Sequence, residues 1–177
     1  TLSHRNTTLN SMSTSQERSV SIIGTGDFGR ALAKPLVAAG MTVLLGSRHP
    51  EKRGATLIER DPALRHARVC SVEEAVTGSN IIFLALHPAA QQQLPHAFPM
   101  LQHKLLVDVS NVQASKTQQQ QQLSNAEQLQ QLFPQCRVVK AFNTVSAMSL
   151  SRGEGDVAVA GDDEAAVASV VALARRM

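Results

Sequence analysis

Six residues near the start of the chain, Gly24-Thr25-Gly26-Asp27-Phe28-Gly29, restrict the possible folds more than any other feature. This Gly-x-Gly-x-x-Gly pattern lies between an apolar run at 20–23 and a segment with helical spacing at 27–39, which predicts a strand, a tight turn and a helix. In that context the first glycine permits the turn, the second lets the backbone approach a pyrophosphate, and the third lets the helix pack closely. The helix N-terminus would present free N–H groups to the phosphates. The pattern therefore predicts a dinucleotide-binding turn.

Strands and helices alternate along the rest of the chain. Apolar runs of strand length predict strands at 20–23, 41–45, 67–70, 80–86, 105–109, 137–142 and 156–160. Segments with helical character lie between these strands, with Ser71 as an expected cap and the pair Ser124 and Glu127 at capping-box spacing. A last helix is expected over 163–177. The alternation predicts an α/β fold with a doubly wound parallel sheet, that is, a single NAD(P)-binding Rossmann domain.

A shift in composition near residue 18 sets the expected domain boundary. Residues 1–18 are rich in Ser, Thr and Asn and have no apolar period, so a flexible leader is expected there. Residues 19–177 are expected to form the NADP-binding domain, because 43% of the 177 residues are hydrophobic and 18% are charged, as in globular proteins. The glutamine tract at 118–122 is predicted to be a mobile loop.

The end of the second predicted strand indicates which dinucleotide would bind. NAD-binding proteins usually carry an Asp or Glu there for the ribose 2′-hydroxyl, whereas this chain has Gly46-Ser47-Arg48 and no carboxylate before Glu51. A guanidinium beside a hydroxyl suits a phosphate dianion better than a bare ribose. Ser47 and Arg48 therefore predict binding of the 2′-phosphate of NADPH, the alternative being an Arg on a solvated helix start.

Polar residues follow three later strands, at the carboxyl ends where open α/β sheets bind ligands. His87 follows Leu84-Ala85-Leu86, Asn111 follows the strand that ends at 109, and Asn143 follows Ala141-Phe142. These residues are expected to line the nicotinamide end of the cofactor, with the Asn143 amide placed to bind a carboxamide or a flavin edge. His87 would orient a ribose or a flavin, or be only a loop residue, and the Asn143 cluster would otherwise be only a turn cap.

Several classes of function lack the residues they need. The net charge of +3 comes without a basic run longer than two residues, and Trp and Tyr are absent, so no nucleic-acid partner is expected. No apolar run reaches the roughly 20 residues of a membrane span, which favours a cytoplasmic domain. Cys70 and Cys136 are expected to be buried thiols, and no metal site is expected. Neither an acid/base pair nor a nucleophile can be assigned as catalytic, and hydride transfer between two cofactors needs none.

At these motifs the sequence resembles the N-terminal cytosolic domain of the STEAP metalloreductases, which is itself similar to F420-dependent NADP oxidoreductases. The resemblance runs from about Val20 to the end of the chain. Besides the glycine-rich turn, it rests on Val43 to Arg48 with Pro50, Leu106-Val107-Asp108-Val109-Ser110-Asn111, Ser124-Asn125-Ala126-Glu127 and Val138-Val139-Lys140-Ala141-Phe142-Asn143. The last three blocks are uncommon outside that family.

The resemblance implies an electron path from NADPH to a metal. NADPH would reduce FAD in the cytosol, and electrons would then pass through haem b in a six-helix membrane domain to reduce Fe(III) or Cu(II). The full-length family protein would lie in the endosomal or plasma membrane, and a homo-oligomer is compatible with the resemblance. The chain stops before the final strand and linker of the family, so a C-terminally truncated domain is expected.

The resemblance also implies a set of NADP contacts, which are Thr25, Gly26, Asp27, Phe28, Ser47, Arg48, Leu84, Ala85, Leu86, His87, Asn111 and Ala141. The flavin contacts are less closely matched. The family often carries an Arg-Glu-His-Tyr-like stretch where this chain has Pro88-Ala89-Ala90-Gln91, and often a Trp where it has Met148. Two alternatives stay open: a soluble F420-type or flavin-type NADP reductase without a membrane partner, and a non-catalytic module that senses NADP.

Overall fold

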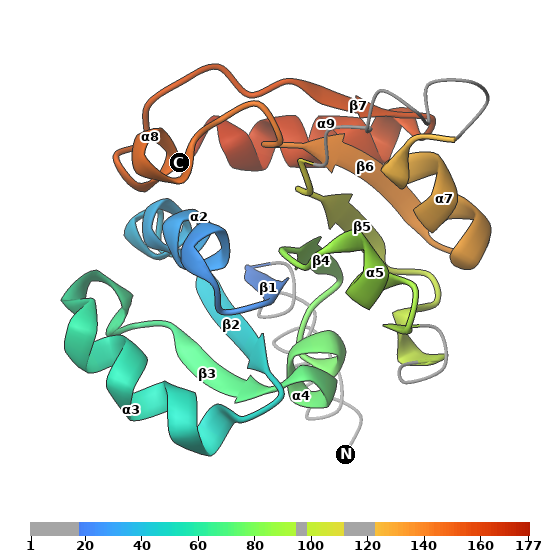
Figure 1. Ribbon diagram of the computed structural model, residues 1–177. Coiled ribbons are helices and arrows are strands. Elements are labelled where there is room, and N and C mark those ends of the chain that lie inside the picture. The colour runs from blue at the N-terminus through green and yellow to red at the C-terminus, as the bar shows by residue number, and fades with distance from the viewer. Residues whose placement is uncertain (1–17, 95–98, 112–122) are drawn as a thin grey trace, which may run out of the picture.

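The computed structural model describes residues 18–94, 99–111 and 123–177, which form one seven-stranded sheet with helices on both faces (Figure 1). The predicted α/β class is thereby confirmed. The leader expected at 1–18, except Arg18, and the glutamine tract at 118–122 lie outside the described residues.

The order of the elements follows the predicted alternation. The first half contains β1 (Ser19–Ile23), α2 (Asp27–Ala38), β2 (Thr42–Ser47), α3 (Pro50–Arg60), the 3-10 helix η1 (Pro62–Leu64), β3 (Arg68–Ser71) and α4 (Val72–Thr77). The second half contains β4 (Ile81–Leu84), α5 (Pro88–Gln91), the 3-10 helix η2 (Pro99–Leu101), β5 (Leu105–Asp108), α7 (Asn125–Leu132), β6 (Arg137–Ala141), α8 (Ala147–Ser151), β7 (Val159–Gly161) and α9 (Glu164–Ala174).

The sheet has a reversal of strand order at its centre. The order is β3-β2-β1-β4-β5-β6-β7, and the pairs among the first six strands are parallel. The chain therefore winds outward from β1 in one direction and from β4 in the other. In doubly wound sheets, ligands bind in the crevice outside the carboxyl ends of the strands at this switch point.

The last strand differs from the prediction of a fully parallel sheet. β7 covers Val159–Gly161 instead of 156–160, and it runs antiparallel to β6, with Lys140 opposite Ala160. A parallel strand would need a crossover along the whole length of β6, which is about 16 Å for five residues. The only helix between the two strands in the described chain is α8, whose five residues extend about 7.5 Å. The chain returns along the same edge instead, and an antiparallel strand results.

The sheet separates two apolar cores. One core contains Ile22 and Val107 of the sheet and Leu32 of α2, and it extends under α3, α8 and α9. The other contains Leu106 of the sheet and Leu129 of α7, and it extends under α4 and η2. Successive strand residues face opposite cores, which explains why the strands read as nearly continuous apolar runs. Both cysteines are free and buried in the second core, as predicted.

Two predicted helix starts are confirmed as capping boxes. The Ser71 hydroxyl accepts a hydrogen bond from the Glu74 N–H at 3.1 Å, and the Glu74 carboxylate accepts one from the Ser71 N–H at 3.0 Å. Ser124 and Glu127 make the same pair of bonds at the start of α7. Among the helices of the described residues, none is both long and apolar enough to cross a membrane.

Candidate functional site

The glycine-rich turn between β1 and α2 lies at the switch point, where two of its glycines are required for packing. Gly24 has a φ of +115°, and a Cβ atom there would overlap the carbonyl oxygen of Ala85. A Cβ atom at Gly29 would overlap the carbonyl oxygen of Gly24 and lie 3.1 Å from its carbonyl carbon. The chain leaves the sheet at this close approach, so that β4 ends at Leu84 and not at Leu86 as predicted. The turn is thus held tightly between β1, β4 and α2.

Gly26 is different, because neither its conformation nor its packing requires a glycine. Its φ of −72° and ψ of −175° are accessible to any residue, and a Cβ atom there would meet nothing within 4 Å. It is the N-cap of α2, and its carbonyl accepts the N–H of Arg30 at 3.0 Å. The missing side chain therefore leaves open space directly at the helix N-terminus. A diphosphate that approaches the backbone closely fits this space.

A cleft of about 620 Å³, here called the large cleft, extends from the turn toward the end of β2. Its walls include the predicted residues Gly24, Thr25, Gly26, Ser47, Arg48, Ala85, Leu86 and His87. Ser47 is nearly buried, and its hydroxyl accepts the N–H of His49 at 3.1 Å. Arg48 is exposed at the rim. The cleft thus joins the backbone of the turn to a hydroxyl and a guanidinium, as the 2′-phosphate prediction requires.

Sequence reasoning missed a second arginine in the large cleft. Arg53 lies in the first turn of α3, and its N–H donates to the carbonyl of His49. Neither Arg48 nor Arg53 takes part in a salt bridge within the described part of the chain. The sequence did contain a signal for Arg53, because a basic residue about one helical turn after a helix start at Pro50 lies near that start.

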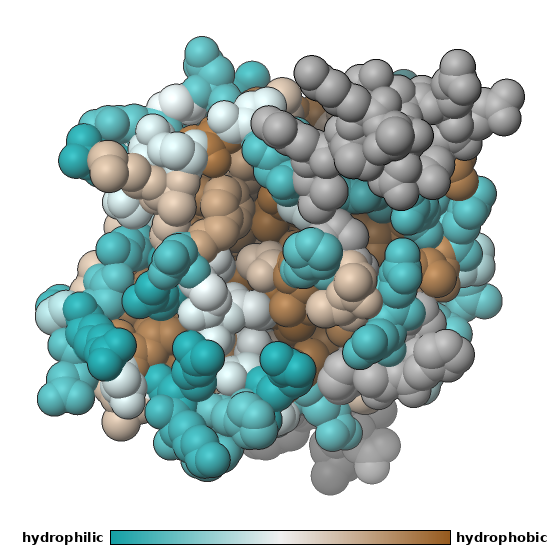
Figure 2. All heavy atoms as spheres, in the orientation of Figure 1, coloured by the Kyte–Doolittle hydropathy of each residue, from teal (hydrophilic) through white to brown (hydrophobic). Residues whose placement is uncertain are grey.

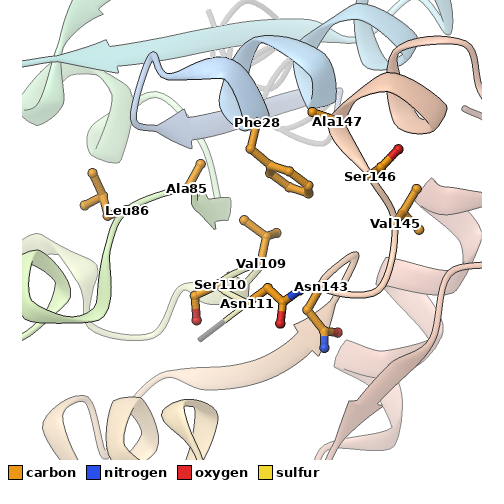
Figure 3. A pocket seen from close by; sticks show the side chains of 10 residues that line it. All are labelled: Phe28, Ala85, Leu86, Val109, Ser110, Asn111, Asn143, Val145, Ser146 and Ala147. Carbon is orange, nitrogen blue, oxygen red and sulfur yellow. The ribbon is translucent and has the colours of Figure 1, made fainter. Parts of the chain in front are cut away.

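A second cleft of about 390 Å³, here called the small cleft, lies beyond the turn. Figure 3 shows Phe28 projecting from α2 toward Val109, with Asn111 and Asn143 on the opposite wall. Its lining residues are Phe28, Ala85, Leu86, Val109, Ser110, Asn111, Asn143, Val145, Ser146 and Ala147, none of which is ionisable. Ala85 and Leu86 also line the large cleft, so the two clefts share a wall at the switch point.

Five predicted contact residues do not line either cleft. Leu84 and Ala141 are buried within strands, and Gly29 packs inside α2. The exposed Asp27 pairs with Arg30. Phe142 is buried in the core with its ring edge-on to Phe83, at a centroid distance of 5.9 Å.

Phe142 nevertheless contributes to the shape of the small cleft. Its φ of +62° is unusual for a residue with a side chain, and it lies directly between the end of β6 and Asn143. The turn at Phe142 leads the chain out of the sheet, and Asn143, Val145 and Ser146 then line the cleft. Ser146 caps α8 by accepting the N–H of Ser149 at 3.0 Å. The sequence did not predict the residues at 145–147 as part of the site, because a helix-cap pattern does not indicate which cleft the helix faces.

His87 lies on the wall of the large cleft, where its Nδ1 accepts the N–H of Ala89 at 3.3 Å. The other lining residues, none of which was predicted as a cofactor contact, are Ile23, Gly46, His49, Val72, Ala90, Gln93 and Leu94. On the face shown in Figure 2, apolar residues at the centre are surrounded by hydrophilic ones.

Comparison with known proteins agrees with this geometry. Residues 19–112 match the family described as NADP oxidoreductase, coenzyme F420-dependent. Rat metalloreductase STEAP3 is 44% identical over 162 residues, which cover 89% of this chain and 32% of the relative. Mouse metalloreductase STEAP2 is 33% identical over 173 residues, which cover 96% of this chain and 34% of the relative. The resemblance to STEAP metalloreductases is confirmed, although the chain spans only about a third of the length of these curated relatives.

A solved structure shares both sequence and fold with the chain. It is the crystal structure of a protein from Arthrobacter sp. FB24 described as a candidate F420-dependent NADP-reductase. The identity is 27%, the TM-score is 0.72, and the match covers 88% of this chain and 79% of that one.

Proposed function

The chain belongs to the family of coenzyme F420-dependent NADP oxidoreductases, and from this membership we propose that it binds NADPH along its two clefts and directs hydride to a flavin. The observation that carries the proposal is the open space at Gly26, which lies beside the wall that the clefts share. A glycine that the fold itself does not need is explained by a ligand that occupies this space.

The backbone of the turn would hold the diphosphate. Gly26 and the first residues of α2 present N–H groups without helical partners, and the partial positive charge of a helix N-terminus favours an anion there. Thr25, which lines the large cleft, adds a hydroxyl beside them. No side-chain cap competes for these groups, because Gly26 is the N-cap and has no side chain.

The far end of the large cleft would bind the 2′-phosphate of the adenosine half. Ser47 supplies a hydroxyl, and the guanidinium groups of Arg48 and Arg53 supply charge-assisted donors. The cleft wall at the end of β2 carries no carboxylate to bind a free ribose 2′-hydroxyl. NADPH should therefore bind more tightly than NADH.

The small cleft would receive the nicotinamide and the ring that accepts the hydride. Phe28 and Val109 form its apolar wall and exclude water, and the side-chain amides of Asn111 and Asn143 can bind a carboxamide or the polar edge of a flavin. When bound, NADPH supplies the hydride. Because none of the side chains that line this cleft is ionisable, the cleft suits an acceptor that takes up hydride without protonation by an acidic side chain of that lining.

FAD is the proposed acceptor, and F420 is the second candidate. The curated relatives are named metalloreductases, and a metal ion is reduced by single electrons, whereas a hydride carries two. A flavin accepts two electrons together and releases them singly, so it can connect the two steps. We extend the proposal to the whole protein: electrons would pass through a haem-containing membrane domain to Fe(III) or Cu(II). The family description and the Arthrobacter protein favour F420 instead.

The test compares NADPH oxidation by this chain with FAD, FMN and F420 added side by side. Faster oxidation with FAD supports the proposal, and oxidation with F420 alone would replace FAD by the second candidate. Tight NADPH binding without oxidation by any of the three would contradict a reductase and favour the module that senses NADP. An affinity for NADH equal to that for NADPH would refute the assignment of Ser47, Arg48 and Arg53.

A further inference from the structure

A group of buried and half-buried polar side chains lies next to the small cleft, at the carboxyl ends of β5 and β6. Asp108 is the last residue of β5 and is completely buried, and its carboxylate accepts the Lys140 ammonium at 2.7 Å. The Lys140 side chain also donates to the carbonyl and the hydroxyl oxygen of Ser110. These three bonds use all three donors of the ammonium group. The ion pair itself does not contact a ligand in either cleft, since neither Asp108 nor Lys140 lines one, whereas Ser110 lies on the lining of the small cleft.

The remaining bonds of Asp108 extend the group in both directions. Its second oxygen accepts the N–H of Ser110 at 3.0 Å and the side-chain amide of Gln91 at 3.3 Å. The Ser110 hydroxyl in turn accepts the Asn125 amide at 3.1 Å. Every carboxylate oxygen is therefore paired, and the backbone at Ser110 is fixed from both its N–H and its carbonyl.

The turn fixed in this way is the wall of the small cleft. Val109, Ser110 and Asn111 follow Asp108 directly, and all three line that cleft (Figure 3). Their position therefore depends on an ion pair between two strands, and not on local hydrogen bonds of the turn alone. A neutral residue at 140 would leave one buried oxygen of Asp108 and the Ser110 carbonyl without their charged partner, and the turn would shift to find others.

We infer that Lys140, paired with Asp108, is a positioning residue that sets the place of the nicotinamide through the turn at 109–111. The inference rests on the proposed function, because it assumes that the small cleft receives the nicotinamide. Binding at the 2′-phosphate end of the site should not depend on Lys140. Ser47 lies at the end of β2, which is separated from β5 by β1 and β4 in the sheet. Gln91, the link toward the large cleft, also donates to the Leu86 carbonyl at 3.2 Å and keeps that bond without Lys140.

The test is calorimetry of Lys140→Met with two ligands. NADPH contacts both ends of the site, whereas 2′,5′-ADP carries the 2′-phosphate but no nicotinamide. We expect the affinity for NADPH to fall about tenfold and the affinity for 2′,5′-ADP to stay within about twofold. Equal losses for both ligands, or no loss for either, would overturn the inference.

Two further variants separate positioning from stability. Lys104→Met removes another partly buried lysine, which donates to the Ser79 carbonyl and the Asn80 side chain at the opposite end of the sheet. It should lower stability and leave both affinities unchanged. If Lys140→Met does not fold, Asp108→Asn combined with Lys140→Met removes both charges of the pair, and the same split between the ligands is expected. Wild-type chain that binds neither ligand would instead refute the proposed function, and the inference would fall with it.

Discussion

Replacing Gly26 by valine should separate binding from folding more clearly than any other change in the turn. The backbone at this position is extended, and a Cβ atom meets nothing within 4 Å, so neither the backbone conformation nor the Cβ atom of a new side chain conflicts with the fold. The cost to folding is limited to a poorer N-cap for α2, about 1 kcal/mol. The branched side chain would occupy the space that we assign to the diphosphate and would cover the N–H groups at the helix start. We expect NADPH affinity to fall by about 100-fold or more, equivalent to about 2.7 kcal/mol.

Gly29→Ala is the matched control for that variant. Its Cβ atom would overlap the backbone of Gly24, so the turn and α2 must move apart, at a cost of about 1–3 kcal/mol or more. The assays are urea unfolding for stability and calorimetry for NADPH binding. Gly26→Val should lose only about 1 kcal/mol of stability but about 100-fold or more in NADPH affinity, whereas Gly29→Ala should lose more stability. Unchanged NADPH binding in Gly26→Val would show that the turn holds no ligand.

Three further predictions concern charge, thiols and acid. Arg48→Ala should weaken NADPH binding about tenfold, because a charge-assisted hydrogen bond contributes about 1.5–3 kcal/mol, and it should leave NADH binding unchanged in calorimetry. Equal losses of affinity for NADPH and NADH would refute the 2′-phosphate site. Burial raises the pKa of the Cys70 and Cys136 thiols, so both thiols should react far more slowly with a thiol reagent in the folded chain than in urea. Equally fast reaction in the folded chain and in urea would contradict their burial. The capping bonds lower the pKa of Glu74 and Glu127 below the ordinary 4.5, so their stabilisation is present above that pH and is lost as the pH falls through the folded-state values. Unfolding free energy measured against pH should therefore fall in acid, and replacing both glutamates by glutamine should flatten that fall.

The parts of the fold that the sequence predicts best are those determined by neighbouring residues. The glycine-rich turn and the capping boxes at Ser71 and Ser124 are local patterns, and each appears where expected. The direction of β7 was not predictable in this way, because an apolar run reads the same in a parallel and an antiparallel strand. Its direction depends on the path of the chain between β6 and β7, in which α8 is too short a helix to carry the chain back along the whole of β6, and only the three-dimensional structure shows that path.

The candidate site shows the same division. Ser47 and Arg48 were predicted because they lie at the end of a strand, whereas Arg53 reaches the large cleft from the first turn of α3. Asp108 and Lys140 stood in two separate blocks of the family resemblance, 32 residues apart, and nothing in their spacing shows that they form an ion pair. That pairing depends on β5 and β6 being neighbours in the sheet.

The central claim is that this chain itself moves hydride from NADPH to a flavin. The most direct measurement is NADPH consumption by the purified chain without oxygen, followed as FAD is increased, with flavin reduction recorded in the same sample. The account predicts that one FAD is reduced for each NADPH consumed, that the rate rises with FAD concentration, and that Gly26→Val abolishes both signals. No NADPH consumption by the wild-type chain at saturating FAD would contradict it.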